Sequence, residues 1–238
     1  MNLNSTDIFG QAVLDFFLKG NATDIRVKSQ DFDEDVIPVN YLFRAYKEMP
    51  KIEQRALDLS EGKILDVGCC AGSHALHLQN QNKDVLAIDV SEGAIKTTKL
   101  RGVKKAEVQD FYQLKNQKFD TVLMLMNGSG IVGKLKNLTQ FFQHLRTILK
   151  PEGKVLLDSS DLRYLFDAEE DGGIWVNPNQ YYGELTYQIG YKNNWSPPFD
   201  WLYIDFNSLA LAAKSNGFSC DLLEEGEHYD YLAMLKPS

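Results

Sequence analysis

The chain has 238 residues, of which 44% are hydrophobic and 24% charged, and this is the composition of a globular protein rather than of a disordered one. Its formal net charge of −8 disfavours broad binding to nucleic acids or anionic membranes, and no apolar run approaches the length needed to span a bilayer. Three cysteines cannot build a disulfide framework and the N-terminus lacks the features of a signal peptide, so we expect a cytoplasmic protein.

The first 60 residues are expected to form a helical extension. Residues 5–19 carry apolar side chains along one stripe, which predicts an amphipathic helix. An acidic loop is predicted over 29–38. Residues 41–49 are predicted to be helical, and Pro50 suits the first turn of the helix that follows.

From residue 63 the pattern alternates between strands and helices. Strands are predicted over 63–67, 84–89, 106–110, 119–126 and 154–158, with helices over 72–80, after Ser91 and over 134–149. The run 119–126 is largely apolar, which is typical of a strand buried on both faces. This alternation predicts βαβ units, right-handed crossovers and a mainly parallel sheet with helices on both faces.

Residues 159–204 differ from this core because all three tryptophans of the chain fall within them. Here 183–192 alternates between apolar and polar side chains, which predicts a half-exposed antiparallel strand. The stretch is either a lid that forms a substrate pocket, or a hairpin that completes the core or a dimer contact. A helix over 205–215 and a strand over 228–236 are predicted to complete the chain.

Polar residues stand where the predicted strands end. Ligands of open α/β sheets bind beyond the carboxyl ends of the strands, so these residues are the candidate ligand contacts. They are Asp66, Asp89, Asp110, Asn127 and Asp158. Because Asp66, Asp89 and Asp110 recur at nearly regular intervals, three carboxylates are predicted to line one edge of one crevice.

A nicotinamide dinucleotide is the first ligand to consider for this crevice. Its fingerprint G-x-G-x-x-G lets the backbone approach a diphosphate at a helix N-terminus. Counted from Gly68, the second and third glycines fall on Cys70 and Ser73. Asp66 would also place a negative charge near the diphosphate. The pattern and its electrostatics therefore disfavour this ligand.

S-adenosylmethionine fits better because it carries a sulfonium, an ammonium and a carboxylate group but no phosphate. Asp66 can attract the cationic end, while Gly68 and Gly72 let the backbone pass close to the cofactor. Without a diphosphate to cradle, a small Cys70 can stand in place of glycine. Asp89 is placed to bridge the two ribose hydroxyls. The further candidates for cofactor contact are Cys69 in the loop, Asp110 at the adenine amino group, and Val90 and Phe111 against the adenine ring.

These motifs, in this order, resemble those of class I S-adenosylmethionine-dependent methyltransferases. "LDVGCCAG" is similar to motif I, "LAIDVS" to the second motif, "VQDF" to the third, "FDTVLMLMN" to the fourth-strand motif and "LKPEGKVLLD" to the segment leading into the fifth strand. The resemblance covers residues 50–158 and extends to 205–236. It implies a seven-stranded sheet with an antiparallel last strand, and a cofactor role for Asn127. Cys70 departs from the family, which usually has glycine there.

In this family, residues ahead of motif I often close over the methionine end of the cofactor. Tyr41 and Arg44 are the candidates here, and the guanidinium of Arg44 can pair with the cofactor carboxylate. The catalytic base stays open among Asp158, Asp161, His74 and the tyrosines of the insert.

No metal site is expected. Cys69 and Cys70 are adjacent and lack the C-x-x-C spacing of metal ligands, and His74 and His77 have no further ligand cluster in view. Asn127 is followed by Gly-Ser-Gly, not by the Pro-Pro-aromatic residues that often accompany methylation of amino groups in nucleic acids and proteins.

We therefore predict one α/β domain of Rossmann-like class, with a mainly parallel seven-stranded sheet. Its parts are an N-terminal helical cap (1–60), a cofactor-binding core (61–158), an aromatic insert (159–204) and a final helix and strands (205–238). The predicted function is methyl transfer from S-adenosylmethionine to a small-molecule or other non-nucleic acceptor, with no nucleic-acid or membrane partner. The alternatives are a non-catalytic cofactor-binding scaffold and a nicotinamide-dependent oxidoreductase. The sequence fixes neither the acceptor nor the oligomeric state.

Overall fold

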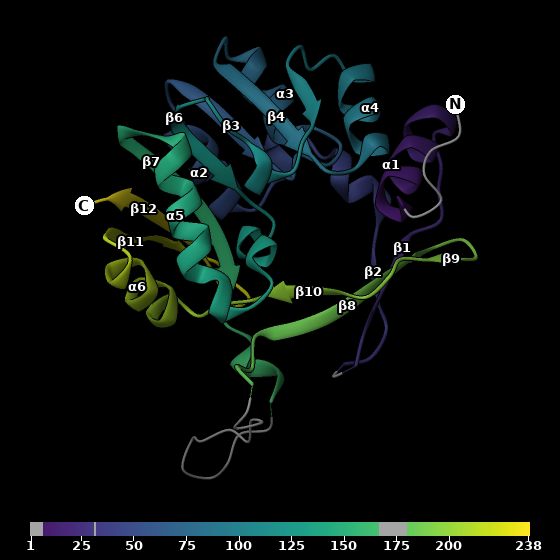
Figure 1. The fold of residues 1–238 in the computed structure, drawn as a ribbon. Helices are drawn as coiled ribbons and strands as arrows, with labels where there is room; N and C mark the ends of the chain where they lie inside the picture. Colours follow the sequence, from purple (N-terminus) through teal and green to yellow (C-terminus); the bar gives the residue numbers. More distant parts are fainter. Residues whose placement is uncertain (1–6, 31, 167–179) are drawn as a thin grey trace.

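A twisted seven-stranded sheet, here called the central sheet, organises the computed structural model, which describes residues 7–30, 32–166 and 180–238 (Figure 1). Its strands are β3 (Lys63–Val67), β4 (Asp84–Asp89), β5 (Ala106–Val108), β6 (Phe119–Met124), β7 (Leu149–Ser160), β11 (Phe218–Glu225) and β12 (Asp230–Pro237). Their order is β11-β12-β7-β6-β3-β4-β5. The five strands from β3 to β7 are parallel, whereas β12 runs antiparallel to β7 and β11. The predicted fold class is confirmed.

The helices lie on both faces of this sheet, as the alternating pattern predicted. They are α1 (Ile8–Lys19), α2 (Lys51–Leu59), α3 (Ser73–Asn80), α4 (Glu92–Leu100), α5 (Leu138–Ile148) and α6 (Phe206–Ser215). Residues 41–49, predicted as one helix, instead form two short 3-10 turns, η1 (Val39–Phe43) and η2 (Tyr46–Glu48). The chain between these turns is extended, because Arg44 and Ala45 leave the helical region.

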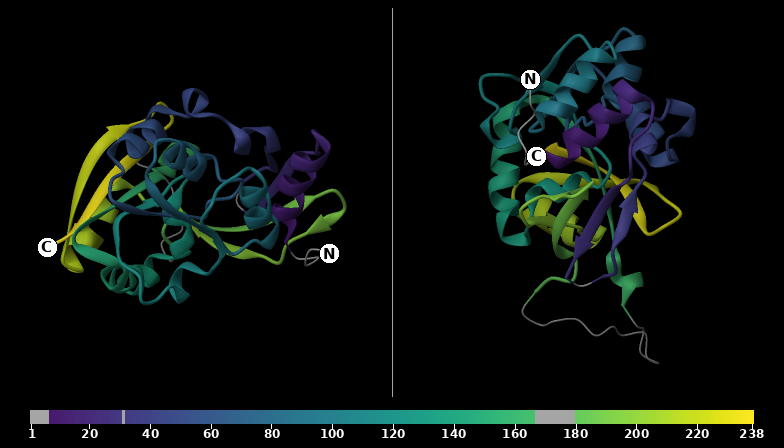
Figure 2. Two further views of the ribbon diagram at one scale, coloured as in Figure 1. Left: turned by 90° about the horizontal axis from the view of Figure 1, so that it is seen from above. Right: turned by 90° about the vertical axis from the view of Figure 1, so that its right-hand side faces the viewer.

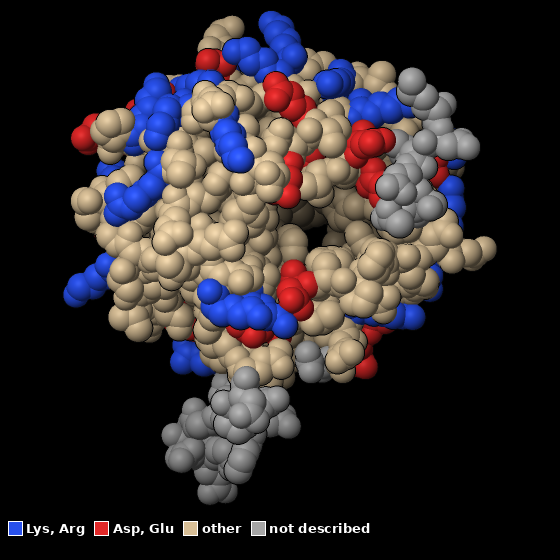
Figure 3. Space-filling model, in the orientation of Figure 1, with Lys and Arg blue, Asp and Glu red and all other residues tan. Residues whose placement is uncertain are grey.

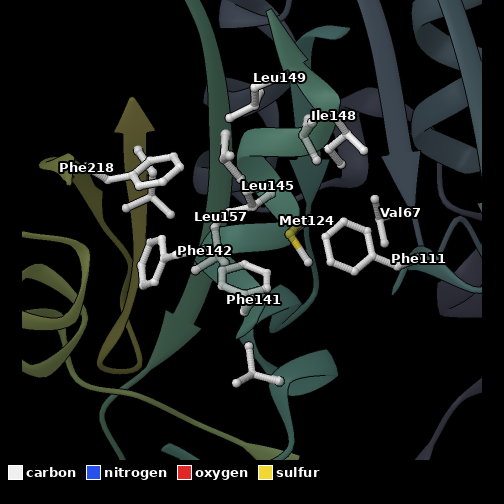
Figure 4. Close-up of a cluster of buried hydrophobic side chains, with 14 of the residues drawn as sticks. Val67, Phe111, Met124, Phe141, Phe142, Leu145, Ile148, Leu149, Leu157 and Phe218 are labelled. Carbon is white, nitrogen blue, oxygen red and sulfur yellow. The ribbon is translucent and has the colours of Figure 1, made fainter. Parts of the chain in front are cut away.

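Two apolar layers cover the central sheet. On one face, Leu65, Val122 and Val155 belong to a cluster that includes the aromatic side of α5 (Figure 4). On the other face, Ile64 and Leu156 belong to a cluster with side chains of α2 and α3. Because side chains alternate along a strand, Asp66 and Asp158 share the second face with Ile64 and Leu156. Asp89 likewise follows Ala87 of that cluster.

A second, antiparallel sheet joins the N-terminal segment to the aromatic insert. It consists of β1 (Ile25–Ser29), β2 (Asp35–Ile37), β8 (Glu184–Tyr191), β9 (Asn194–Trp195) and β10 (Phe199–Leu202). The order is β10-β8-β1-β2, and Arg26 of β1 stands opposite Gly190 of β8. The structure bears out the half-exposed strand expected in the insert. The prediction of an acidic loop over 29–38 is partly wrong, because β2 occupies 35–37 and pairs with β1.

A third apolar cluster holds the second sheet against the central one. It gathers Ile8 and Val13 of α1, Ile25 of β1 and Tyr191 of β8 around Ala71, which lies between β3 and α3. The views in Figure 2 place α1 beside the far end of the second sheet. This packing brings the N-terminal segment to the loop that the sequence assigns to the cofactor. Within the described part of the chain, no helix is both long and apolar enough to cross a membrane.

Candidate active site

Three residues of the loop after β3 have backbone angles in the left-handed region. The φ angles are 70° at Gly68, 51° at Cys70 and 78° at Gly72. A Cβ added at Gly68 would meet open space, whereas one at Gly72 would lie 2.7 Å from Thr98 of α4. Gly72 therefore lets α3 begin close to α4, and Gly68 leaves room above the strand end. Glycine adopts such angles without a steric penalty, but cysteine does not.

The position of Cys70 yields a first prediction. Replacing Cys70 by glycine removes the cost of a side chain at positive φ, so we expect unchanged affinity for S-adenosylmethionine and an equal or higher melting temperature. Replacing it by valine is expected to cost about 1–2 kcal/mol, because a β-branched residue resists this conformation. Thermal unfolding and isothermal titration check both variants. A glycine variant that melts clearly below wild type would contradict the argument.

Cys69 plays a packing role in the same loop. Its side chain is buried, and its Sγ lies 3.9 Å from Oγ1 of Thr98. Its backbone N–H, like that of Gly68, donates to the carbonyl of Ile88 in β4. These bonds fix the loop against the neighbouring strand.

Asp89 holds the loop from the end of β4. Its Oδ2 accepts the N–H of Cys70 at 2.9 Å, and its Oδ1 accepts the N–H of Ser91 at 2.9 Å. A carboxylate offers about four acceptor positions, so each oxygen keeps a lone pair for a ligand. Burial raises the pKa of Asp89, and the neighbouring charges of Asp7 and Asp66 add to the rise. Two hydroxyl donors from a ribose would satisfy this carboxylate.

Asp66 is a buried carboxylate with an unused oxygen. Its side chain is only 2% exposed, and its Oδ2 has no hydrogen-bond partner. Burial raises the pKa of Asp66, while nearby His74 and the backbone N–H of Ala75 oppose the rise. An unsatisfied buried acceptor carries a free-energy cost that a donor from a ligand removes. The residue therefore fits the ammonium end of S-adenosylmethionine.

Arg44 lies at the same end of the site but is already paired. Its Nη2 donates to both carboxylate oxygens of Glu53, and His74 Nε2 lies 2.8 Å from Glu53 Oε2. The guanidinium stacks 4.0 Å above the Tyr41 ring. Its Nε is buried without a partner, so one donor stays available to an anionic ligand.

Glu53 is the site residue that the sequence analysis did not include. Its pKa is lowered: burial by itself would raise the value, but His74 and Arg44 outweigh that effect. A signal did exist, because α2 buries Ile52, Ala56 and Leu57, and Glu53 falls on the same stripe. A carboxylate at a core position of an amphipathic helix indicates a buried partner.

The other predicted contacts lie differently around the crevice. Val90 is 71% exposed beyond β4, and Asp110 is exposed and accepts the N–H of Tyr112. Phe111 is 2% exposed and packs in the core near Phe141 (Figure 4), so its ring does not line the crevice. Asn127 accepts from Ser159 and donates to the carbonyl of Leu202, toward the insert.

Asp158 lies at the end of β7, beside the chain that leaves β6. Its Oδ2 accepts the N–H of Met126 at 3.0 Å, and its Oδ1 accepts the N–H of Gly128 at 2.9 Å. The residue is 5% exposed. Burial raises its pKa to about 7, and the negative charge of Glu53 contributes to the rise.

Two of the other candidate bases, Asp161 and His74, are engaged by neighbouring side chains. Asp161 binds Arg163 and the hydroxyl of Tyr182, and His74 binds Glu53.

Among the residues that the structure describes, no group of three or more His, Cys, Asp or Glu side chains is placed to hold a metal ion. The face of the molecule seen in Figure 1 is hollowed near its centre, and acidic side chains lie at the rim of the hollow (Figure 3).

Comparisons with known proteins agree with this geometry. A family model described as a methyltransferase domain matches residues 65–157. A solved S-adenosylmethionine-dependent methyltransferase from Bacteroides fragilis, in complex with S-adenosyl-L-homocysteine, is 47% identical, with a TM-score of 0.92 over 100% of this chain and 98% of that one. The PH0226 protein from Pyrococcus horikoshii OT3 shares the fold at 20% identity, with a TM-score of 0.57 over 82% of this chain and 95% of that one.

A curated relative extends the comparison. It is the ubiquinone biosynthesis O-methyltransferase of Rickettsia canadensis (strain McKiel), 32% identical over 114 residues, which cover 46% of this chain and 47% of that protein. The chain thus matches about half the length of this relative. The fold and the loop define an S-adenosylmethionine-binding enzyme. The chain belongs to the class I S-adenosylmethionine-dependent methyltransferases.

Proposed function

We propose that this methyltransferase modifies a small molecule, which binds between the carboxyl edge of the central sheet and the second sheet. The observation that carries the proposal is the second sheet itself. Two segments far apart in the sequence build it. Its strand β10 ends at Leu202, whose carbonyl accepts hydrogen bonds from Asn127 and Ser129 in the segment after β6. This arrangement favours an acceptor of limited size.

The strand order suggests how the cofactor lies. Asp110 follows β5, Asp89 ends β4, and Asp66 lies in β3 beside Gly68. In our proposal the adenine binds near Asp110, the ribose hydroxyls bind Asp89, and the methionine end lies near Asp66 and the free Nε of Arg44. The sulfonium methyl then points toward β6 and β7, where Asp158 lies.

The chemistry follows from this placement. S-adenosylmethionine supplies an already activated methyl group, so the chain's residues mainly align the two reactants. Such alignment is worth about 7–11 kcal/mol in favourable cases. The tie between Asp89 and the loop, and the cluster of Arg44, Glu53 and His74, hold the cofactor contacts in fixed positions. Burial raises the pKa of Asp66 and of Asp158, and a cationic donor bound beside them would favour their ionised form.

Two observations argue against a nucleic-acid acceptor. The chain is acidic, with a net charge of −8, and acidic side chains lie at the rim of the hollow in Figure 3. The segment after β6 has Asn127 in a left-handed conformation, and its side chain is used by the insert rather than left open. The curated relatives are named as O-methyltransferases of ubiquinone biosynthesis, so a hydroxyl acceptor is the alternative to the amine argued below.

A labelling experiment tests the proposal. The protein is incubated with methyl-labelled S-adenosylmethionine and a cell extract divided into a small-molecule filtrate, a protein fraction and a nucleic-acid fraction. We expect label in the filtrate alone, and a heat-inactivated sample gives the background. Label in protein or nucleic acid, with none in the filtrate, would refute a small-molecule acceptor. Thermal unfolding with S-adenosylhomocysteine reports cofactor binding separately.

A further inference from the structure

We infer that Asp158 binds the methyl acceptor directly, that the acceptor is an amine, and that Asp158 takes its proton. This inference rests on the proposed function. It assigns the catalytic base, which the sequence left open, and the chemical class of the substrate.

The position of Asp158 is the first argument. The strand order places β7 beside β6, on the opposite side of β3 from the ribose site on β4. Asp158 shares a sheet face with Asp66 and is fixed by two backbone amides, from Met126 and Gly128. Its carboxylate is therefore held in one orientation at the reacting end, with one lone pair of each oxygen still free.

The missing counter-charge is the second argument. Of the salt bridges between described residues, none involves Asp158, and the side chains of Arg44 and His74 are both bound to Glu53. A buried carboxylate without a cation is unfavourable unless a ligand provides one. An ammonium group would supply this charge together with N–H donors, whereas an alcohol would supply only a donor.

Two tyrosines lie within electrostatic reach of the same carboxylate. Burial raises the pKa of Tyr41 and of Tyr203, and the charge of Asp158 adds to the rise in both cases. The Tyr203 hydroxyl lies 3.3 Å from that of Tyr187. Aromatic faces attract cations, and the Tyr41 ring already receives one in the guanidinium of Arg44. The carboxylate of Asp158 therefore carries the preference for an amine over a neutral acceptor.

The proposed transfer moves one proton to Asp158 and one methyl group to nitrogen. The ammonium form of the acceptor binds to ionised Asp158 and transfers one proton to it, which leaves a neutral amine. The nitrogen lone pair then forms a bond to the methyl carbon while the carbon–sulfur bond breaks, and that electron pair stays on sulfur. The products are S-adenosylhomocysteine and a methylated ammonium ion, and Asp158 later releases its proton to water.

Binding of matched probes to the full chain, loaded with S-adenosylhomocysteine, tests this inference. Benzylamine and benzyl alcohol have nearly the same shape, and only the first is a cation. We expect benzylamine to bind about tenfold more tightly or better, as charge-assisted hydrogen bonds are stronger than neutral ones. Asp158→Asn should abolish this preference and change the affinity for S-adenosylhomocysteine by less than about twofold. Asp161→Asn, which removes a carboxylate engaged by Arg163, should preserve it.

The pH dependence of wild type supplies a measurement that needs no variant. Benzylamine affinity should rise as pH increases through about 7, because Asp158 ionises there while the amine stays protonated. The other titratable groups facing Asp158 are Glu53, His74, Tyr41 and Tyr203. His74→Gln should keep a pH dependence but move its midpoint to higher pH, because the charge of His74 lowers the pKa of Asp158.

Several results would overturn the inference. They are equal or undetectable binding of both probes, a preference that survives Asp158→Asn, a flat pH profile, and a profile abolished by His74→Gln. Each can occur while S-adenosylhomocysteine still binds and label still enters the small-molecule filtrate. Failure of this inference is thus distinguishable from failure of the proposed function.

Discussion

Replacement of Asp89 by alanine is expected to weaken the affinity for S-adenosylmethionine by about 100-fold or more. The carboxylate would accept two ribose hydroxyls, and each hydrogen bond to a charged group contributes about 1.5–3 kcal/mol. The variant also loses the bonds to the N–H groups of Cys70 and Ser91, so the loop itself becomes less fixed. Isothermal titration measures the affinity, and thermal unfolding without ligand measures the effect on the fold.

The first residue of the same strand offers a matched control. Asp84 is exposed at the opposite end of β4 and pairs with Lys105, so Asp84→Ala should leave the affinity within about twofold, because exposed ion pairs contribute little. Asp89→Asn keeps one acceptor oxygen and should fall between wild type and alanine. Unchanged affinity in Asp89→Ala would show that the ribose binds elsewhere.

Replacement of Gly183 by alanine is expected to destabilise the protein by about 3 kcal/mol, at the upper end of the usual cost of overpacking. The added Cβ would lie 1.9 Å from the carbonyl oxygen of Tyr203, which is backbone and cannot rotate away. Gly183 also accepts the N–H of Tyr203, so the two strands would have to separate. For a chain of this length we expect the melting temperature to fall by about 6–12 °C.

Gly190, near the other end of β8, allows crowding against a side chain to be compared with crowding against backbone. A Cβ there would lie 2.9 Å from the ring of Trp195, which is a side chain near the turn between β8 and β9. A side chain can move more readily than backbone, but Arg26 and Lys28 lie against this ring, so Gly190→Ala should cost about 1–2 kcal/mol, less than Gly183→Ala. Equal losses of stability in Gly183→Ala and Gly190→Ala would contradict the argument that crowding against the backbone of Tyr203 costs more than crowding against the side chain of Trp195.

The central sheet was predictable because its strands carry local signals. The apolar stretches at β3, β4 and β6 end in polar residues, and parallel strands bring those ends to one edge. The positions of Asp66 and Asp89 followed from that rule alone. Gly68 and Gly72 were predictable because glycine lets the backbone pass close to a cofactor, and both adopt the left-handed conformation that glycine favours.

The second sheet was not predictable, because no local pattern encodes its pairing. β1 has only five residues and β2 three, and their partner β8 lies beyond the whole cofactor-binding core. The acidic residues around β2 resemble a loop because this is an edge strand with exposed side chains. Such strands are recognised only when the opposite strand is known.

The direction in which side chains point was the other feature of the site that the sequence did not reveal. Phe111 follows the end of a strand, as an adenine contact would, but the 3-10 turn η3 (Phe111–Gln113) directs its ring into the core. Arg44 is predicted as a cofactor contact without its partner Glu53; the position of Glu53 on the buried stripe of α2 indicates a buried partner but does not say which residue it is.

The second sheet also has a consequence for biosynthesis. Arg26 of β1 donates to the carbonyl of Lys192, just beyond β8, and these residues are 166 positions apart. At about 5–20 residues per second, a ribosome needs roughly 8–33 s to add the partner after β1 has emerged. During this interval β1 and β2 form at most a two-stranded hairpin, which is marginally stable in water. The cofactor loop is therefore translated well before the second sheet can form beside it.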